Sequence, residues 1–209
     1  MKHVVLLGDS IFDNEAYSGT GRDVSSQLQL LLLDWKVTLL AVDGSTTLDM
    51  APQIRKIPAN TTHIVVSMGG NDALGSMGLL DAKVRSVTES FNLIGTTMTG
   101  FSQRYQTMLE AILERGYSTA LSTIYYPRLP DPELQQVAVI ALAFFNDLIF
   151  SQAIQHGLPV LDLRFICNDD ADYANPIEPS GSGSAKIAAA IQRLLSGHDF
   201  STARTEVFV

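Results

Sequence analysis

The chain has 209 residues, of which 46% are hydrophobic and 17% are charged. This composition can fill a core and excludes a disordered or low-complexity protein. The length is close to that of one domain, about 100–200 residues, so we expect a single domain over residues 1–209. Twenty-two acidic against 14 basic residues give a net charge of −8. Such a surface repels phosphate backbones and anionic lipid, so nucleic acid is not an expected partner.

No targeting or membrane-spanning segment is predicted. The first apolar run, Val4–Leu7, is too short for the apolar region of a signal peptide. No uninterrupted apolar run approaches the ~20 residues that span a bilayer. We therefore expect a cytoplasmic protein without membrane insertion. The single cysteine, Cys167, cannot form an intrachain disulfide and is interpreted as a small buried hydrophobic residue.

Short apolar runs alternate with amphipathic stretches along the chain. The runs are rich in Val, Ile and Leu without strict alternation, which is typical of strands covered on both faces. They are Val4–Leu7, Val37–Val42, Ile64–Met68, Thr119–Ile124 and Pro159–Leu163. Helices are predicted between them by two sets of residues that share one face, Val24, Leu28, Leu31 and Leu32, and Phe101, Tyr105, Met108, Leu109 and Ile112. Asp131-Pro132-Glu133 predicts the start of a further helix.

Strands that alternate with helices predict a parallel sheet with right-handed crossovers. The expected fold is a three-layer α/β/α domain with five parallel strands. The glycine-containing stretch over residues 72–100 predicts a long, partly helical excursion after the third strand. Such an excursion either forms a lid or substrate wall or packs on the core as a surface elaboration.

Polar clusters follow the first three predicted strands. They are Gly8-Asp9-Ser10, Asp43-Gly44-Ser45 and Gly69-Gly70-Asn71-Asp72. In an open parallel sheet, ligands bind beyond the carboxyl ends of the strands. A serine directly after a strand can expose its hydroxyl while its own N–H points into the cleft. A glycine in the next loop admits a second N–H, and an asparagine amide adds a third donor. The clusters therefore predict a nucleophilic Ser10 beside an oxyanion hole.

These blocks resemble those of the SGNH (GDSL-type) hydrolase superfamily over nearly the whole chain. The matching segments are Val5-Leu6-Leu7-Gly8-Asp9-Ser10-Ile11, the glycine in Val42-Asp43-Gly44-Ser45, Met68-Gly69-Gly70-Asn71-Asp72, and Pro176-Ile177-Glu178-Pro179-Ser180 with Gly183 and Lys186-Ile187-Ala188 after it. The resemblance implies a flavodoxin-like α/β/α fold and hydrolysis of an ester or related acyl bond, with no metal and no cofactor. It also implies that Ser10 is the nucleophile and that Ser10 N–H, Gly44 N–H and Asn71 form the oxyanion hole.

The last block departs from the family pattern. Members usually carry Asp-x-x-His there, the histidine as general base and the aspartate orienting it, whereas this chain has Asn175 and Glu178. Glu178 is a candidate base if burial raises its pKa, and it is equally a candidate for a structural hydrogen bond. Asp9 is interpreted as capping or orienting the serine turn, and it is grouped with Gly44 and Asn71 as an oxyanion or substrate-binding residue. Asp172 is a candidate for coupling to Glu178.

The four histidines offer no replacement base. His3, His63 and His156 precede strands and are expected at the amino ends, opposite the cleft. His198 follows the last helix, which runs back to that same end. We expect each of them to be an ordinary surface or capping residue.

Three functions remain open on these residues. The first is a serine ester hydrolase that acts on a small-molecule ester or acyl substrate through Ser10, Glu178 and Asn175. The second is a catalytically impaired protein on the same scaffold that binds such a ligand without efficient turnover. The third, a nucleotide or flavin binder, is the weakest, because Gly19-Thr20-Gly21 lacks the lysine of a phosphate loop. Both a monomer and a homo-oligomer agree with the sequence.

Overall fold

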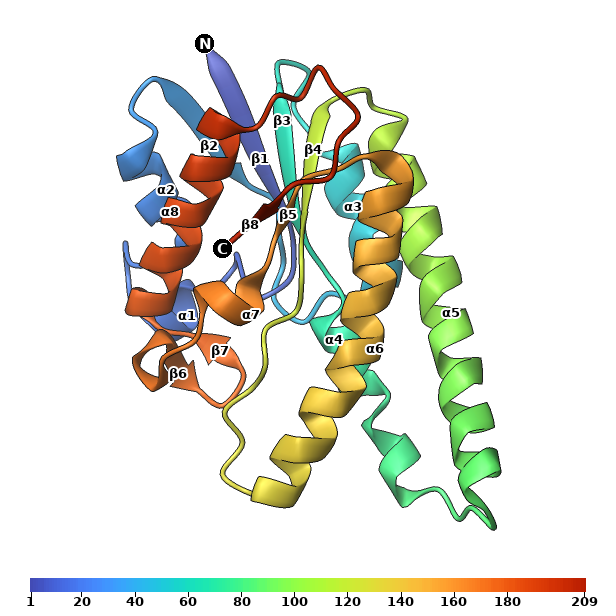
Figure 1. The fold of residues 1–209 in the computed structure, drawn as a ribbon. Helices are drawn as coiled ribbons and strands as arrows, with labels where there is room; N and C mark the ends of the chain where they lie inside the picture. The colour runs from blue at the N-terminus through green and yellow to red at the C-terminus, as the bar shows by residue number, and fades with distance from the viewer.

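The structure is a computed structural model that describes residues 1–209. A sheet of six parallel strands in the order β2-β1-β3-β4-β5-β8 forms the middle layer, and helices cover both of its faces (Figure 1). The predicted three-layer α/β/α fold is therefore confirmed. The strands are β1 (Lys2–Gly8), β2 (Trp35–Leu39), β3 (His63–Ser67), β4 (Ser118–Ser122), β5 (Val160–Leu161) and β8 (Val207–Phe208).

The prediction of five strands was wrong by one. The C-terminal segment returns to the edge of the sheet as β8 and pairs in parallel with β5. The N–H of Val160 donates to the carbonyl of Glu206 at 2.8 Å, and the N–H of Asp162 donates to the carbonyl of Phe208 at 2.8 Å. This strand has only two residues and follows a polar tail, so it leaves no apolar run in the sequence.

Two apolar clusters lie on opposite faces of the sheet, because successive side chains of a strand point to opposite sides. Val4 and Leu6 of β1 pack in the first cluster and Val5 and Leu7 in the second. Cys167 belongs to the first cluster and is 2% exposed, as expected. The first face carries α2 (Val24–Leu31), α7 (Leu163–Ile166) and α8 (Gly181–Gly197), and the second carries α3 (Met50–Arg55), α5 (Val87–Leu113) and α6 (Pro132–His156).

The predicted helices form with one local difference. All five residues expected on the inner face of α5 are buried, whereas Leu31 at the end of α2 is 48% exposed. The chain leaves the helical conformation at Leu32, and this residue turns into the core in place of Leu31. Asp131 caps α6 as predicted, since its Oδ1 accepts from the N–H groups of Glu133 and Leu134.

By length and composition, α6 is apolar enough to cross a membrane. The sequence expectation considered only uninterrupted apolar runs, and α6 contains polar residues such as Asn146 and Asp147. Phe145, Ile149 and Ala153 pack against the sheet in the second cluster. A core helix of a globular fold meets the same criterion, and one face of α6 packs on the sheet here.

The remaining short elements gather at the carboxyl ends of the strands. They are α1 (Glu15–Ser18), α4 (Gly70–Gly75), the single-turn helices η1 (Thr47–Asp49), η2 (Met77–Asp81) and η3 (Asp170–Asp172), and the antiparallel pair β6 (Tyr173–Asn175) and β7 (Glu178–Pro179). The first turns of α5 and α6 project beyond the sheet at this same end (Figure 1). This end is therefore where a ligand would meet both loops and helices.

Candidate active site

The turn that carries Ser10 depends on a glycine. Gly8 ends β1 with a φ of 143°, and a Cβ there would collide with the carbonyl of Ser67 on the neighbouring strand β3. The buried Gln53 side chain accepts from the N–H of Gly8 at 2.9 Å and donates to its carbonyl at 2.8 Å. Ser10 follows at once and is 7% exposed. The strand end therefore fixes the serine at the edge of the sheet.

Ser10 and Glu178 are in direct contact. The Ser10 hydroxyl donates to Oε1 of Glu178 at 3.1 Å, although the two residues are 168 positions apart in the chain. Oε2 of Glu178 is buried and has no hydrogen-bond partner. The Glu178 carboxylate takes part in no ion pair. The arrangement is a hydroxyl beside a carboxyl group that has a spare acceptor and no cation.

Asn175 contacts the backbone of Glu178, not its carboxyl group. Its Oδ1 accepts from the N–H groups of Ile177 and Glu178, both at 3.0 Å. These bonds close the turn between β6 and β7, where Asn175 pairs with Glu178. Asn175 is exposed and therefore acts on the carboxylate only by positioning the strand that carries it.

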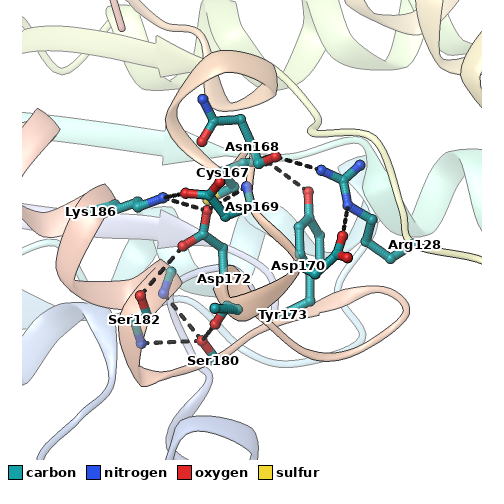
Figure 2. Close-up of polar contacts among 12 residues, drawn as sticks. Arg128, Cys167, Asn168, Asp169, Asp170, Asp172, Tyr173, Ser180, Ser182 and Lys186 are labelled. Atoms are coloured by element: carbon teal, nitrogen blue, oxygen red, sulfur yellow. Dashed lines mark hydrogen bonds and ion pairs between the residues drawn. The ribbon is translucent and has the colours of Figure 1, made fainter.

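A polar network fixes the segment around this hairpin (Figure 2). Asp172 accepts from Nζ of Lys186 at 2.7 Å and from the Ser182 hydroxyl at 3.4 Å. The Tyr173 hydroxyl donates to the carbonyl of Cys167, and the Arg128 guanidinium lies 5.0 Å from the centre of its ring. Asp172 is therefore paired with Lys186 of α8 and does not contact Glu178. Its carbonyl accepts from the N–H of Ser180, directly after β7.

The proposed oxyanion donors are only partly gathered in one place. The backbone N–H groups of Ser10 and Gly44 donate to no acceptor in the protein. Nδ2 of Asn71 donates to the carbonyl of Ser45 at 3.0 Å, which ties the third loop to the second. Ser10 and Asn71 both line the cavity described below. Gly44 does not line it, but it is next in the chain to Ser45, whose carbonyl Asn71 contacts.

Asp72 holds the second and third loops together. Its carboxylate accepts from the Thr47 N–H at 2.9 Å and from the Thr47 hydroxyl at 2.7 Å. Arg104 of α5 lies 3.5 Å from the same carboxylate. These three contacts on one buried carboxylate fix α4 beside η1.

A cavity of about 340 Å³ opens at Ser10 and Glu178. Of the 29 residues that line it, 21 are hydrophobic, so its wall suits an apolar group better than a polar one. The lining comes from α4, η2, α5, α6 and the loop after β4 and includes Leu74, Met77, Met98, Ala141 and Phe145. The excursion over residues 72–100 therefore forms a wall of this cavity.

Two carboxyl groups at the cavity have raised pKa values. Burial raises the pKa of Glu178 from 4.5 to about 7, the Ser10 hydroxyl opposes this rise, and the negative charge of Asp43 adds to it. Burial likewise raises the pKa of Asp9 from 3.8 to about 7, against the effect of the Ile11 N–H. A carboxylate with a pKa near neutrality is a much stronger base than an ordinary glutamate.

The histidines lie far from this end of the fold. His3 and His63 begin β1 and β3, and His156 ends α6 before β5. His198 contacts Glu206, whose carbonyl pairs with the first residue of β5. All of them therefore occupy the amino ends of the strands, but His3 and His198 are buried, so the expectation of surface residues was wrong for these two. No group of three or more His, Cys, Asp or Glu side chains is arranged to hold a metal ion.

Sequence reasoning missed Gln53 and the cavity residues of α6. Gln53 lies on α3 between the buried residues Met50 and Ile54, and a polar residue on a buried face is a signal that could have been read. Ala141 carries no such signal, because an alanine on an apolar helix fits a core equally well. Only the folded chain shows that Ala138 and Ala141 of α6 face the cavity.

Comparisons with known proteins agree with this fold. Solved structures with the same fold include a member of the lipolytic G-D-S-L family from Veillonella parvula, with a TM-score of 0.71, 15% identity, and coverage of 94% of this chain and 98% of that one. A putative arylesterase from Agrobacterium tumefaciens has a TM-score of 0.67 and 15% identity, over 94% of this chain and 99% of that one. A lipase from a goat rumen metagenome has a TM-score of 0.67 and 18% identity, over 94% and 98%.

At these identities the structures show the fold alone. No curated protein matches the chain in sequence. The model of the GDSL-like lipase/acylhydrolase family matches residues 6–186, which include Ser10, Gly44, Asn71 and Glu178. The chain belongs to the GDSL-like lipase/acylhydrolase family of hydrolases.

Proposed function

We propose that the protein hydrolyses an ester or related acyl bond, with Ser10 as nucleophile and Glu178 in place of the usual histidine base. The observation that carries this proposal is the 3.1 Å hydrogen bond from the Ser10 hydroxyl to Glu178 at the mouth of an apolar cavity. A glutamate in solution is a poor base toward a hydroxyl. Its buried position supports a basic carboxylate here, since burial raises its pKa to about 7.

The reaction needs two rounds of proton transfer at one carboxylate. Glu178 takes the proton of Ser10 as Oγ attacks the acyl carbon, and it returns the proton to the leaving alcohol when the acyl–oxygen bond breaks. In the second round Glu178 takes a proton from water as the water oxygen attacks the acyl-enzyme, and it returns this proton to Oγ of Ser10 as the acid leaves. The N–H groups of Ser10 and Gly44 and the amide of Asn71 stabilise the negative oxygen in both steps.

The acyl half of the substrate is an apolar chain. The cavity runs along α6 from Phe145, near the sheet, to Leu134. Eleven residues at 1.5 Å rise span about 16 Å, the length of an extended chain of roughly a dozen carbons. We propose a small-molecule substrate of this kind, hydrolysed in the cytoplasm without metal, cofactor, nucleic acid or membrane insertion.

A serine-directed probe tests the proposal. A fluorophosphonate should label the wild-type protein on Ser10, located by mass spectrometry of the adduct, because only an activated hydroxyl attacks phosphorus at a useful rate. The Ser10→Ala variant should not be labelled. Ser182 is the serine used for comparison: its hydroxyl also donates to a carboxylate, that of Asp172, and it should carry no adduct in the wild-type protein. Folded protein that stays unlabelled would instead favour a ligand-binding protein without turnover.

The cavity should set the preferred chain length. Ala141 lines the cavity on α6, so Ala141→Phe should fill part of it and shift the preference toward short acyl chains. We expect kcat/KM for a dodecanoyl ester to fall at least tenfold while that for an acetyl ester changes little. Ala143→Phe is the control, because Ala143 is exposed and does not line the cavity. An equal loss for both esters would place the acyl chain elsewhere.

A further inference from the structure

Asp9 is a second buried carboxyl group in the wall of the cavity, and the mechanism above does not use it. The residue is 2% exposed. Its Oδ1 accepts from the N–H of Ile11 at 3.2 Å, and Oδ2 has no hydrogen-bond donor in the protein. A methyl group built on Gly70 would lie 3.7 Å from Oδ2. The free oxygen therefore faces the start of α4, beside Asn71.

The charges around Asp9 are negative. Burial raises its pKa most, the carboxyl groups of Glu178 and Asp72 add to the rise, and the Arg104 guanidinium is paired with Asp72. The other titratable neighbours are the hydroxyls of Tyr105 and Tyr125, whose pKa values are raised by burial and which stay neutral. A third carboxylate buried between two others without a cation is strongly disfavoured. Glu178 accepts from the Ser10 hydroxyl, whereas Oδ2 of Asp9 accepts from no donor in the protein, so Asp9 is the less favourable of the two carboxyl groups for a negative charge.

We propose that Asp9 is a neutral carboxylic acid that donates a hydrogen bond from Oδ2 to the oxyanion, as a further member of the oxyanion hole. This inference rests on the proposed acyl hydrolysis at Ser10. An ionised Asp9 beside Gly70 and Asn71 would repel the negative oxygen and cancel the donors that surround it. A protonated carboxyl group at the same place adds a donor, and an apolar site can hold such a group neutral near pH 7.

The proposal predicts a loss of activity at alkaline pH. Burial raises the pKa of Asp9 to about 7, as it does that of Glu178, and because the two carboxyl groups interact the second ionisation of the pair lies above the first. When this second ionisation takes the proton from Asp9, its donor becomes a repulsive acceptor. The rate of the wild-type enzyme should therefore rise as Glu178 ionises and fall as Asp9 ionises. The two limbs belong to the interacting pair, and their midpoints are apparent values.

Two substitutions separate a donor from a structural group. Asp9→Asn keeps an acceptor for the Ile11 N–H and places an amide donor at the Oδ2 position, whereas Asp9→Ala removes both. We expect Asp9→Ala to lower kcat/KM for a neutral ester by about 10²–10³, as for other oxyanion donors. Asp9→Asn should lose less than tenfold, and its alkaline limb should disappear. Asp34→Asn, at an exposed turn, is the control and should keep both limbs.

A direct titration makes the result independent of activity. The ¹³Cγ resonance of Asp9, assigned by its absence in Asp9→Asn, should titrate well above the ordinary range of aspartate. A midpoint below about 5, near the usual aspartate value, or an alkaline limb that persists in Asp9→Asn, overturns the proposal. If Ser10 is not labelled by a fluorophosphonate, the proposed function and the role of Asp9 both fail. If Ser10 is labelled and Asp9 titrates low, only the role of Asp9 fails.

Discussion

Glu178→Gln should lower kcat/KM for a neutral ester by about 10²–10⁴, the usual contribution of a general base. The amide keeps the shape of the side chain and can still contact Ser10, but it cannot take a proton. In the wild type, the acid limb of the pH–rate profile should rise as Glu178 ionises, because the base acts only when ionised and burial raises its pKa above the ordinary glutamate value. In Glu178→Gln this rising limb should disappear, and a pH–rate profile of both proteins checks it.

Two comparisons make the result specific to the carboxylate at this position. Glu114→Gln changes an exposed acid at the far end of α5 and should leave the profile unchanged. Glu178→Asp keeps the carboxylate but moves it one methylene away from Ser10, so its activity should lie between those of the wild type and Glu178→Gln. Substantial activity in folded Glu178→Gln, with its rising limb intact, would show that the base lies elsewhere.

Most of the fold could be predicted from the sequence, because buried parallel strands give continuous apolar runs. β1 and β3 follow such runs closely, and their glycine-rich ends mark where the chain leaves the sheet. β8 could not be read in this way, since it is held by backbone bonds to β5 and has two residues. Leu31 shows a related limit. Both Leu31 and Leu32 were expected on the buried face of one helix, but α2 ends at Leu31, and only Leu32 is buried.

The site was readable in part because its donors follow successive strands. Strand order alone brings Ser10 and Asn71 to one edge of the sheet. The partner of Asn175 was not readable, because the same residue type can bind a side chain or close a turn, and here it binds the N–H of Glu178. The raised pKa of Asp9 depends on burial and on the carboxyl groups of Glu178 and Asp72, which only the folded chain brings together.

The stability of the protein should depend on pH in a way that separates a base from a structural carboxylate. A carboxyl group whose pKa is higher in the folded state stabilises the fold below its unfolded pKa, and this contribution is lost as the pH rises through the folded pKa. For Glu178 the two values are 4.5 and about 7. The free energy of unfolding of the wild type should therefore fall between these values and then level off.

Glu178→Gln removes this loss. Each pKa unit corresponds to about 1.4 kcal/mol, and solvent screening reduces the effect, so the variant should gain about 1–2 kcal/mol over the wild type between about pH 5 and pH 8. Urea unfolding of both proteins at several pH values measures the difference, with Glu114→Gln as the control. A structural carboxylate that depended on its charge would give the opposite sign, because its replacement would destabilise the fold at neutral pH. A variant that loses turnover and gains stability at alkaline pH would mark Glu178 as a group kept in the fold for its chemistry.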